Sequence, residues 1–570
     1  FISKNENFWF KLEKLSTKIN EVECYNVTIL DRFDDEIEAC FNLNKTYWFG
    51  GHESYDQPYW PINSQRFDYV PYVTGFADDW SAVLERYWIS SNGISLFVDD
   101  DIALLVKHTE NNTICLKSSK NSNPYKFTSI YSNLLQYTLC KGTNIKTLQL
   151  YMIEEYLGKP ENKPDLLMMK YPIFTTWNYF FRNINQSIIL DYAEDIRKNN
   201  YTASQLEIDD KWEVHYGDLD FDLSKFPSPK EMSEKLHDMG MRVTIWVHPF
   251  CNIDSFNFVP GIDQSYWVLD STGEHPGFTK WWNGKNSVII DTTNPNSIDY
   301  FRTKLNFLKN NYKIDSFKFD AGETAWIPKS FQLYDKNSHP DVYAQNYAKF
   351  AAEEQGKFLE IRVGHRTQNL GVFYRILDRA TDWSIHDGIK SVITQTLQFG
   401  ILGYPFVLPD IIGGNDDPNI KNKELFIRWT QLTAFLPTMQ FGVPPWFFDE
   451  ETNKICKIFV DLHTNFIFPY ISNLPIDGQP IIRPMWWLEP LNEIFFNISD
   501  QFLVGDDILV APILDQGKTS RLIYFPGGNW YDLEKKEYIA GPVKLEINAD
   551  LYHIPYYINE KGLSKFDLNF

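Results

Sequence analysis

The strongest constraint on this chain is a run of short apolar strands alternating with amphipathic helices over about 300 residues, starting near residue 168. The strand candidates are residues 172–177, 204–209, 242–247, 314–320, 358–363, 372–378, 404–409 and 437–441. A helical period separates neighbouring candidates, as where Met232, Leu236 and Met239 share one face of a predicted helix. A crossover of this kind joins parallel strands, so residues 166–475 are predicted to form a closed (β/α)8 barrel.

Patterns typical of β-strands flank the predicted barrel. Residues 1–165 contain short β-branched and aromatic runs divided by Gly, Asn and Asp, which predicts an N-terminal β-sandwich. Residues 127–131 are one predicted strand there, and residues 145–157 are a predicted helix. Residues 476–570 contain similar short runs, which predicts one or two C-terminal β-sandwich domains. The expected fold class is therefore α/β, with β domains on both sides of a barrel.

Composition excludes some partners and leaves others open. The chain has 570 residues and a net charge of −21, which argues against nucleic acid and anionic membranes because both need basic patches. Aromatic residues make up 16% of the chain, which suits core packing and also stacking against sugar rings. No apolar run reaches the length of a transmembrane helix. A homo-oligomer is compatible with these properties.

Cysteines and glycosylation sequons predict the compartment. The two short-range pairs Cys24/Cys40 and Cys115/Cys140 are expected disulfides, and Cys251 and Cys456 are expected to be free or buried. Six Asn-x-Ser/Thr sequons are candidate N-glycosylation sites, at Asn26, Asn44, Asn111, Asn185, Asn200 and Asn497. Together they predict a secretory-pathway lumen, of the endoplasmic reticulum or outside the cell. A signal or membrane anchor upstream of residue 1 is compatible with this expectation.

Three predicted strands end on carboxylates. Asp320 closes one strand, and Lys318 points to the same face because strand side chains alternate. Asp209 and Asp210 close another strand, and Asp378 closes a third. Each also has an ordinary interpretation: a surface ion pair at Asp320, a turn or helix cap at Asp209, and an ion pair with the next arginine at Asp378.

Taken together, these acids favour glycoside hydrolysis. The carboxyl ends of barrel strands meet at one mouth, and five tryptophans map to the same end: Trp177, Trp212, Trp246, Trp281 and Trp282. One carboxylate can attack or stabilise the sugar centre while a second protonates the leaving oxygen. A metal hydrolase is the rival class. No histidine pair has metal-ligand spacing, and no GxSxG motif is present, so no metal or cofactor is expected.

The segment Phe317-Lys318-Phe319-Asp320-Ala321-Gly322-Glu323 resembles the nucleophile motif of glycoside hydrolase family 31. Residues 478–484 and 500–505 resemble its C-terminal region. Members of this family are retaining α-glycosidases with a catalytic barrel between β domains. The resemblance implies that Asp320 is the nucleophile and Asp378 the general acid/base, with Asp382 and Asp387 as neighbouring alternatives. It also implies that the general acid has the higher pKa of the pair. The implied substrate-binding residues are Asp209, Asp210, Trp177, Trp246, Trp282, Lys318, Arg362 and Asp410.

One departure from the family pattern concerns specificity. Many members have a histidine before Asp-Ile-Gly-Gly, where this chain has Pro409 before Asp410. A branch of the family with ascribed α-galactosidase activity has the same pattern. The resemblance therefore implies an exo-acting α-galactosidase whose substrate is an oligosaccharide or glycoconjugate with terminal α-galactose. An α-glucosidase of the same fold and a catalytically silent sugar-binding protein are the alternatives.

Overall fold

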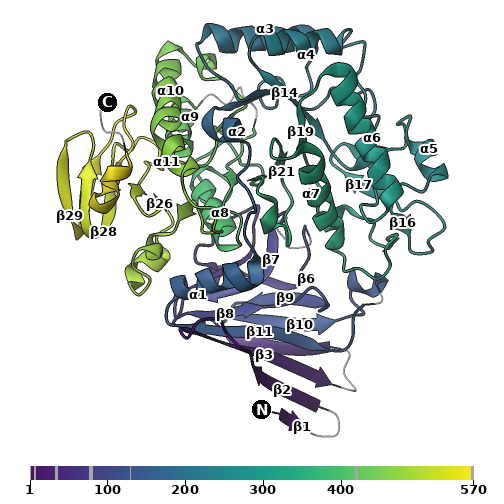
Figure 1. Ribbon diagram of the computed structural model, residues 1–570, viewed down its shortest axis with the longest axis vertical. Coiled ribbons are helices and arrows are strands. Elements are labelled where there is room, and N and C mark those ends of the chain that lie inside the picture. Colours follow the sequence, from purple (N-terminus) through teal and green to yellow (C-terminus); the bar gives the residue numbers. More distant parts are fainter. Residues whose placement is uncertain are drawn as a thin grey trace.

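The computed structural model describes residues 2–4, 8–31, 36–75, 81–128, 130–416 and 422–566. Three regions follow one another along the chain (Figure 1): two antiparallel sheets, a barrel of parallel strands, and a further antiparallel sheet. In this view the N-terminal sheets lie below the barrel and the C-terminal sheet lies beside it. Within the described residues, no helix combines the length and apolarity needed to cross a membrane.

The barrel prediction is confirmed. Eight parallel strands lie in the order β23-β22-β21-β19-β14-β13-β12-β24, and a parallel bridge from Ile412 to Phe441 nearly closes the ring. The strands are β12 (Ile173–Thr175), β13 (Gln205–Ile208), β14 (Arg242–Val247), β19 (Ser316–Phe319), β21 (Glu360–Ile361), β22 (Phe373–Arg375), β23 (Val407–Leu408) and β24 (Gln440–Phe441). Each lies inside one of the eight predicted ranges, because buried parallel strands are recognisable as short apolar runs.

Helices surround the barrel. They include α3 (Gln186–Lys198), α4 (Pro229–Asp238), α6 (Pro295–Tyr312), α7 (Val342–Gln355), α8 (Ile389–Ile401), α9 (Lys423–Thr433) and α10 (Glu450–Leu462). Helix α4 has Pro229 in its first turn, and the Ser228 side chain before it makes no capping hydrogen bond. Helix α8 is buried on nearly every side, because it packs against both β5 (Trp48–His52) and β25 (Ile482–Arg483).

The N-terminal region is a sandwich of two antiparallel sheets. One contains β1-β2-β3-β11-β8-β7-β5 and the other β4-β10-β9-β6. Residues from both sheets, such as Trp88 and Leu116, share one apolar core, so the sheets pack face to face. Their strands are β1 (Ile2–Lys4), β2 (Phe8–Lys14), β3 (Val22–Asp31), β4 (Glu36–Asn42), β5, β6 (Phe67–Pro71), β7 (Leu84–Ser90), β8 (Ile94–Phe97), β9 (Leu104–Thr109), β10 (Thr113–Ser119) and β11 (Leu135–Gly142).

One local prediction in this region needs correction. Residues 127–131 do not form a strand: a 3-10 turn spans Tyr125–Phe127, and residue 129 lies outside the described residues. Buried Tyr125 donates a hydrogen bond to Leu104 O at 2.6 Å, and this contact favours the turn. The predicted helix over residues 145–157 is α1 (Ile145–Met152), continued by a π-helical turn to Leu157.

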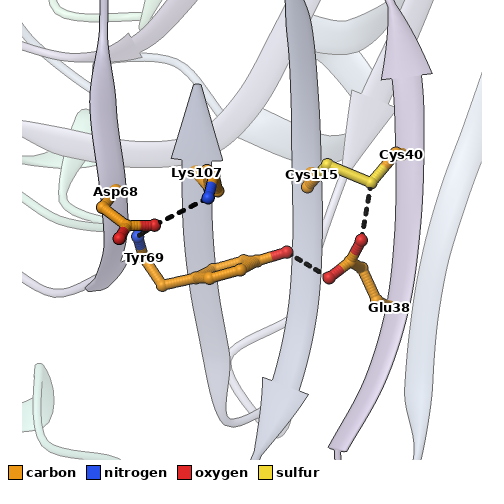
Figure 2. The surroundings of a disulfide bond; sticks show 6 residues. All are labelled: Glu38, Cys40, Asp68, Tyr69, Lys107 and Cys115. Atoms are coloured by element: carbon orange, nitrogen blue, oxygen red, sulfur yellow. Dashed lines mark hydrogen bonds and ion pairs between the residues drawn. A yellow bond between two sulfur atoms is a disulfide. The ribbon is translucent and has the colours of Figure 1, made fainter. Parts of the chain in front are cut away.

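The four predicted disulfide cysteines are bonded, but the predicted partners are wrong. The bonds join Cys24 to Cys140 and Cys40 to Cys115. In each case the two cysteines face each other in the antiparallel register, on β3 and β11 or on β4 and β10. Figure 2 shows the second bond between its two strands, where the Tyr69 hydroxyl donates to the Glu38 carboxylate. Sequence separation is a poor guide here, because strand register and not chain proximity brings the sulfur atoms together.

The C-terminal region is confirmed as sheet-rich. Among the described residues it is one antiparallel sheet in the order β25-β26-β27-β30-β28-β29. The strands beyond β25 are β26 (Phe502–Val504), β27 (Ile508–Val510), β28 (Ser520–Asp532), β29 (Glu537–Asn548) and β30 (Tyr556–Asn559). Arg428 on α9 is buried against this sheet, donating hydrogen bonds to Ala549 O at 3.0 Å and Asp550 O at 2.8 Å. These hydrogen bonds connect the C-terminal domain to helix α9 of the barrel.

Candidate active site

A pocket of about 280 Å³ lies at the carboxyl ends of the barrel strands. It is lined by Trp177, Asp209, Asp210, Trp246, Trp282, Lys318, Asp320, Arg362, Arg375, Asp378, Asp410 and Asn415. The structure brings together all ten candidate catalytic and substrate-binding residues predicted from the sequence. The other two lining residues, Arg375 and Asn415, were not predicted.

Asp320 lies directly after β19, where the chain turns sharply. Gly322 has φ of +95°, and a Cβ at this position would lie 2.3 Å from Tyr347 Cδ1, so only glycine fits the turn. The Tyr347 hydroxyl donates to Asp320 O at 3.0 Å and fixes the backbone on the other side. The backbone of Asp320 is therefore held in place at the barrel mouth.

Two arginines and a tryptophan contact the Asp320 carboxylate. Arg375 donates to Oδ1 at 3.0 Å, Arg362 lies 3.2 Å from the same oxygen, and the Trp246 indole donates to Oδ2 at 2.9 Å. Burial alone would raise the pKa of Asp320, but Arg362, Arg375 and Lys318 outweigh burial and hold its pKa well below the ordinary value. Asp320 is consequently an ionised carboxylate at neutral pH, which is the form a nucleophile needs.

Asp378 lies at the mouth of the pocket, with 49% of its side chain exposed. Arg375 donates to Asp378 Oδ1 at 2.8 Å through one guanidinium nitrogen and to Asp320 through the other. Burial opposes ionisation of Asp378, but Arg375 and then Arg362 lower its pKa. The pKa of this carboxyl is therefore lowered and not raised. The alternatives Asp382 and Asp387 do not line the pocket.

Lys318 lies on β19 and belongs to a buried charge network beneath the pocket. Its ammonium lies 3.0 Å from Asp209 Oδ2, 3.1 Å from Glu207 Oε1 and 3.7 Å from Glu360 Oε1. Burial would lower the pKa of Lys318, but these three carboxylates raise it well above its ordinary value. Lys318 thus orients Asp209 directly and acts on Asp320 through space.

The remaining predicted residues form the walls. Both oxygens of Asp210 accept hydrogen bonds from the Tyr216 hydroxyl, at 2.9 and 3.2 Å, and one accepts from Arg182 at 3.0 Å. Asp410 follows β23 and accepts from Arg375 at 3.3 Å. Trp282 is 45% exposed, and its ring lies 5.5 Å from the Arg362 guanidinium carbon. Of the five tryptophans mapped to this end, Trp212 and Trp281 are buried behind the wall.

Three residues at the site were missed by sequence reasoning. Arg375 ends β22 three residues before Asp378, and its position at a strand end was the available signal. Glu323 closes the nucleophile motif and lies 2.9 Å from Arg362 Nε, so it orients that arginine. Asn415 donates to Asp410 at 2.5 Å and carried no signal in the sequence.

Among the described residues, a cluster outside the pocket has the residue types of a metal site. Asp100, His339 and His365 could place three ligand atoms near one another at the junction of the N-terminal domain and the barrel. His365 Nδ1 donates to Leu84 O at 2.8 Å, and its Nε2 lies 3.0 Å from Asp100 Oδ1. Two arginines, one of them Arg366 at 3.5 Å, already flank Asp100. The cluster is therefore balanced as an ion-pair network with protonated His365.

The six candidate glycosylation sites differ in exposure. Asn44, Asn111, Asn200 and Asn497 are exposed. Asn26 and Asn185 are half-buried, and the Asn185 side-chain oxygen accepts a hydrogen bond from Ile188 N at the start of α3. Modification at all six stays a prediction.

The barrel fold and the carboxylate-lined pocket define a glycosidase. The sequence model of the Glycosyl hydrolases family 31 TIM-barrel domain matches residues 168–474, and that of the Glycosyl hydrolase family 31 C-terminal domain matches residues 478–562. The chain therefore belongs to glycoside hydrolase family 31. It is 36% identical over 533 residues to the myogenesis-regulating glycosidase of Mus musculus, covering 90% of this chain and 74% of that protein.

Two further proteins, one compared by sequence and one by structure, are similar to this chain. The SITS-binding protein of Tetronarce californica is 28% identical over 95% of this chain and 78% of its own length. A solved family 31 α-xylosidase from a soil metagenome has a TM-score of 0.78 at 18% identity, covering 98% of this chain and 92% of the xylosidase. At that identity the structural likeness shows the fold alone.

Proposed function

We propose that this protein is a retaining, exo-acting α-glycosidase that releases terminal α-linked galactose. The proposal rests mainly on one observation: the two terminal nitrogens of Arg375 donate hydrogen bonds to two different carboxylates, Asp320 and Asp378, at the barrel mouth. Two neighbouring carboxylates at a sugar-sized pocket are what double displacement requires. The pocket volume is close to the lower limit of about 300 Å³ for ligand sites, which favours a single terminal sugar unit.

The two carboxylates take different roles because their surroundings differ. Asp320 is buried between two arginines and stays ionised, so it attacks the anomeric carbon. Asp378 is half-exposed, so it can exchange protons with solvent and protonate the leaving oxygen. It then removes a proton from the water that releases the sugar. Arg375 keeps Asp378 ionised before substrate arrives, and burial beneath the bound sugar favours the protonated form.

The galactose preference rests on Pro409, which stands where many family members have a histidine. Other sugars are alternatives, because family relatives include an α-xylosidase and a sulfoquinovosidase by name. A panel of aryl α-galactosides, α-glucosides and α-xylosides decides the preference. Turnover of the glucoside without the galactoside would overturn it, and no turnover at all would favour a silent sugar-binding protein.

Retention of configuration has its own test. Proton NMR of the first product identifies the anomer released before mutarotation equilibrates it. A two-step displacement through Asp320 releases the α-anomer first. Release of the β-anomer would contradict the mechanism and assign both carboxylates to a one-step inverting reaction.

We also propose that the protein works in the secretory pathway. The bonds Cys24–Cys140 and Cys40–Cys115 support this, because disulfides persist in oxidising compartments. Enzymatic removal of N-glycans from the cell-derived protein is expected to increase its gel mobility. An unchanged mobility would remove the sequons as support for this compartment.

A further inference from the structure

The N-terminal domain reaches the active site through residues 50–57, which include the last part of β5 and the chain just after it. Gln398 on α8 donates to Gly50 O at 2.7 Å and to His52 O at 3.0 Å. Gln395 on the same helix donates to Ser54 O at 2.6 Å. Because these donors lie on a buried barrel helix, residues 50–57 are fixed relative to the catalytic strands.

Glu53 lies in the middle of this segment and is fully buried. Its Oε1 accepts a hydrogen bond from Leu377 N at 2.7 Å, and its Oε2 accepts from Val83 N at 3.3 Å. Leu377 directly precedes Asp378 in the chain. Glu53 therefore holds the backbone that carries the predicted acid/base, although it belongs to a different domain.

Other contacts fix the same short segment from the barrel side. The Arg379 Nε donates to Leu377 O at 2.7 Å, and Ile376 N donates to Leu408 O at 3.0 Å. Without Glu53, the N–H of Leu377 would be left without its partner in the interior, which favours movement of the backbone. No regular strand bonds hold Asp378 itself, since β22 ends three residues earlier.

The contact does not depend on the charge of Glu53. Burial raises the pKa of Glu53 to about 8, with the Leu377 N–H and Arg379 opposing it. Oε1 can accept the Leu377 hydrogen bond whether or not Oε2 carries a proton. A glutamine at this position can therefore keep the contact through its carbonyl oxygen.

We propose that Glu53 is a positioning residue for Asp378, so that the N-terminal domain completes the active site. This inference rests on the proposed function, because it requires Asp378 to act as the general acid. It does not depend on which sugar is cleaved.

The test compares two aryl α-glycosides of one sugar, one with an acidic phenol that leaves without help and one with a weakly acidic phenol that needs protonation. A misplacement of about 1 Å costs on the order of 100-fold in rate. We therefore expect Glu53→Ala to lower kcat/KM for the poor leaving group by about 100-fold and to affect the good leaving group far less. Equal losses on both substrates would overturn the inference, because a folding defect does not distinguish leaving groups.

Two further variants keep the test decisive. Glu53→Gln retains an acceptor for Leu377 and is expected to keep most of the activity on both substrates; a loss as large as that of Glu53→Ala would overturn the role. If Glu53→Ala does not fold, Glu53→Asp replaces it, because the shorter side chain draws the carboxylate away from Leu377.

The matched control is Glu85→Ala, whose buried carboxylate accepts from Arg366 N at 2.7 Å at the same domain junction. Its losses should be equal on both substrates.

Failure of the proposed function looks different from failure of this inference. If the wild-type protein hydrolyses no glycoside, the enzymatic proposal fails before any variant is made. If the wild type hydrolyses glucosides and not galactosides, the sugar assignment fails and the same leaving-group series is run with glucosides. Only the ratio of the kcat/KM losses on the two leaving groups tests the role of Glu53.

Discussion

The contribution of His365 to folding stability, and its dependence on pH, can be predicted from the structure in both sign and size. Its imidazole is fully buried at the junction of the N-terminal domain and the barrel. Carboxylates face it from three elements: Asp100 lies 3.0 Å from Nε2, Asp341 lies 3.9 Å from Nε2, and Glu85 lies 3.9 Å from Nδ1. The neighbouring charged or titratable groups are Arg86, Arg366 and His339. The perturbation is the substitution His365→Gln.

The expected change in folding free energy is calculated from the pKa of His365. Burial lowers this pKa, but Asp100, Asp341 and Glu85 outweigh burial and raise it from 6.5 to about 9. At 1.36 kcal/mol for each pKa unit, the difference corresponds to about 3 kcal/mol of folding free energy. Because the folded-state pKa is raised, this contribution is fully present below pH 6.5, shrinks as the pH rises and is lost above about pH 9.

The assay is thermal or denaturant unfolding of the wild type and the His365→Gln variant between pH 6 and pH 10. The stability difference between them should fall by about 3 kcal/mol over this range. His463→Gln is the matched control, because His463 is equally buried but its pKa is lowered by burial. That side chain is neutral throughout the alkaline range. A wild-type advantage over His365→Gln that stays constant or grows from pH 7 to pH 10 would refute the reasoning.

Three further predictions concern the pocket. Asp320→Asn should lower kcat by about 10⁴-fold or more, measured with aryl glycosides, and retained activity would remove its role as nucleophile. Arg375→Gln should move the alkaline limb of the kcat/KM profile to higher pH, because Arg375 lowers the pKa of Asp378 and the general acid must be protonated. Arg375→Lys should move the limb less, and an unmoved or lowered limb in Arg375→Gln would contradict the assignment. Trp282→Ala should raise KM about 2- to 10-fold with little change in thermal stability, because the ring is 45% exposed; an unchanged KM would exclude stacking on the sugar.

The amino-acid sequence determined the barrel and most of the pocket lining. Each barrel strand is a short apolar run between helical periods, so all eight were recognisable without tertiary information. Asp209 and Asp320 directly follow such strands, and strand polarity places both at one mouth. These features are local or follow from the regular geometry of parallel strands. For that reason the sequence was sufficient to find them.

Tertiary structure decided the features that depend on strand register and contacts between domains. The pairing of Cys24 with Cys140 follows from the alignment of β3 with β11, which chain separation does not reveal. The role of Arg375 is recognisable only in the tertiary structure, where its guanidinium donates to both Asp320 and Asp378. The role of Glu53 is likewise recognisable only once residues 50–57 are packed against α8. Contacts between residues more than 300 positions apart have no local signature, because they form only after each region has folded.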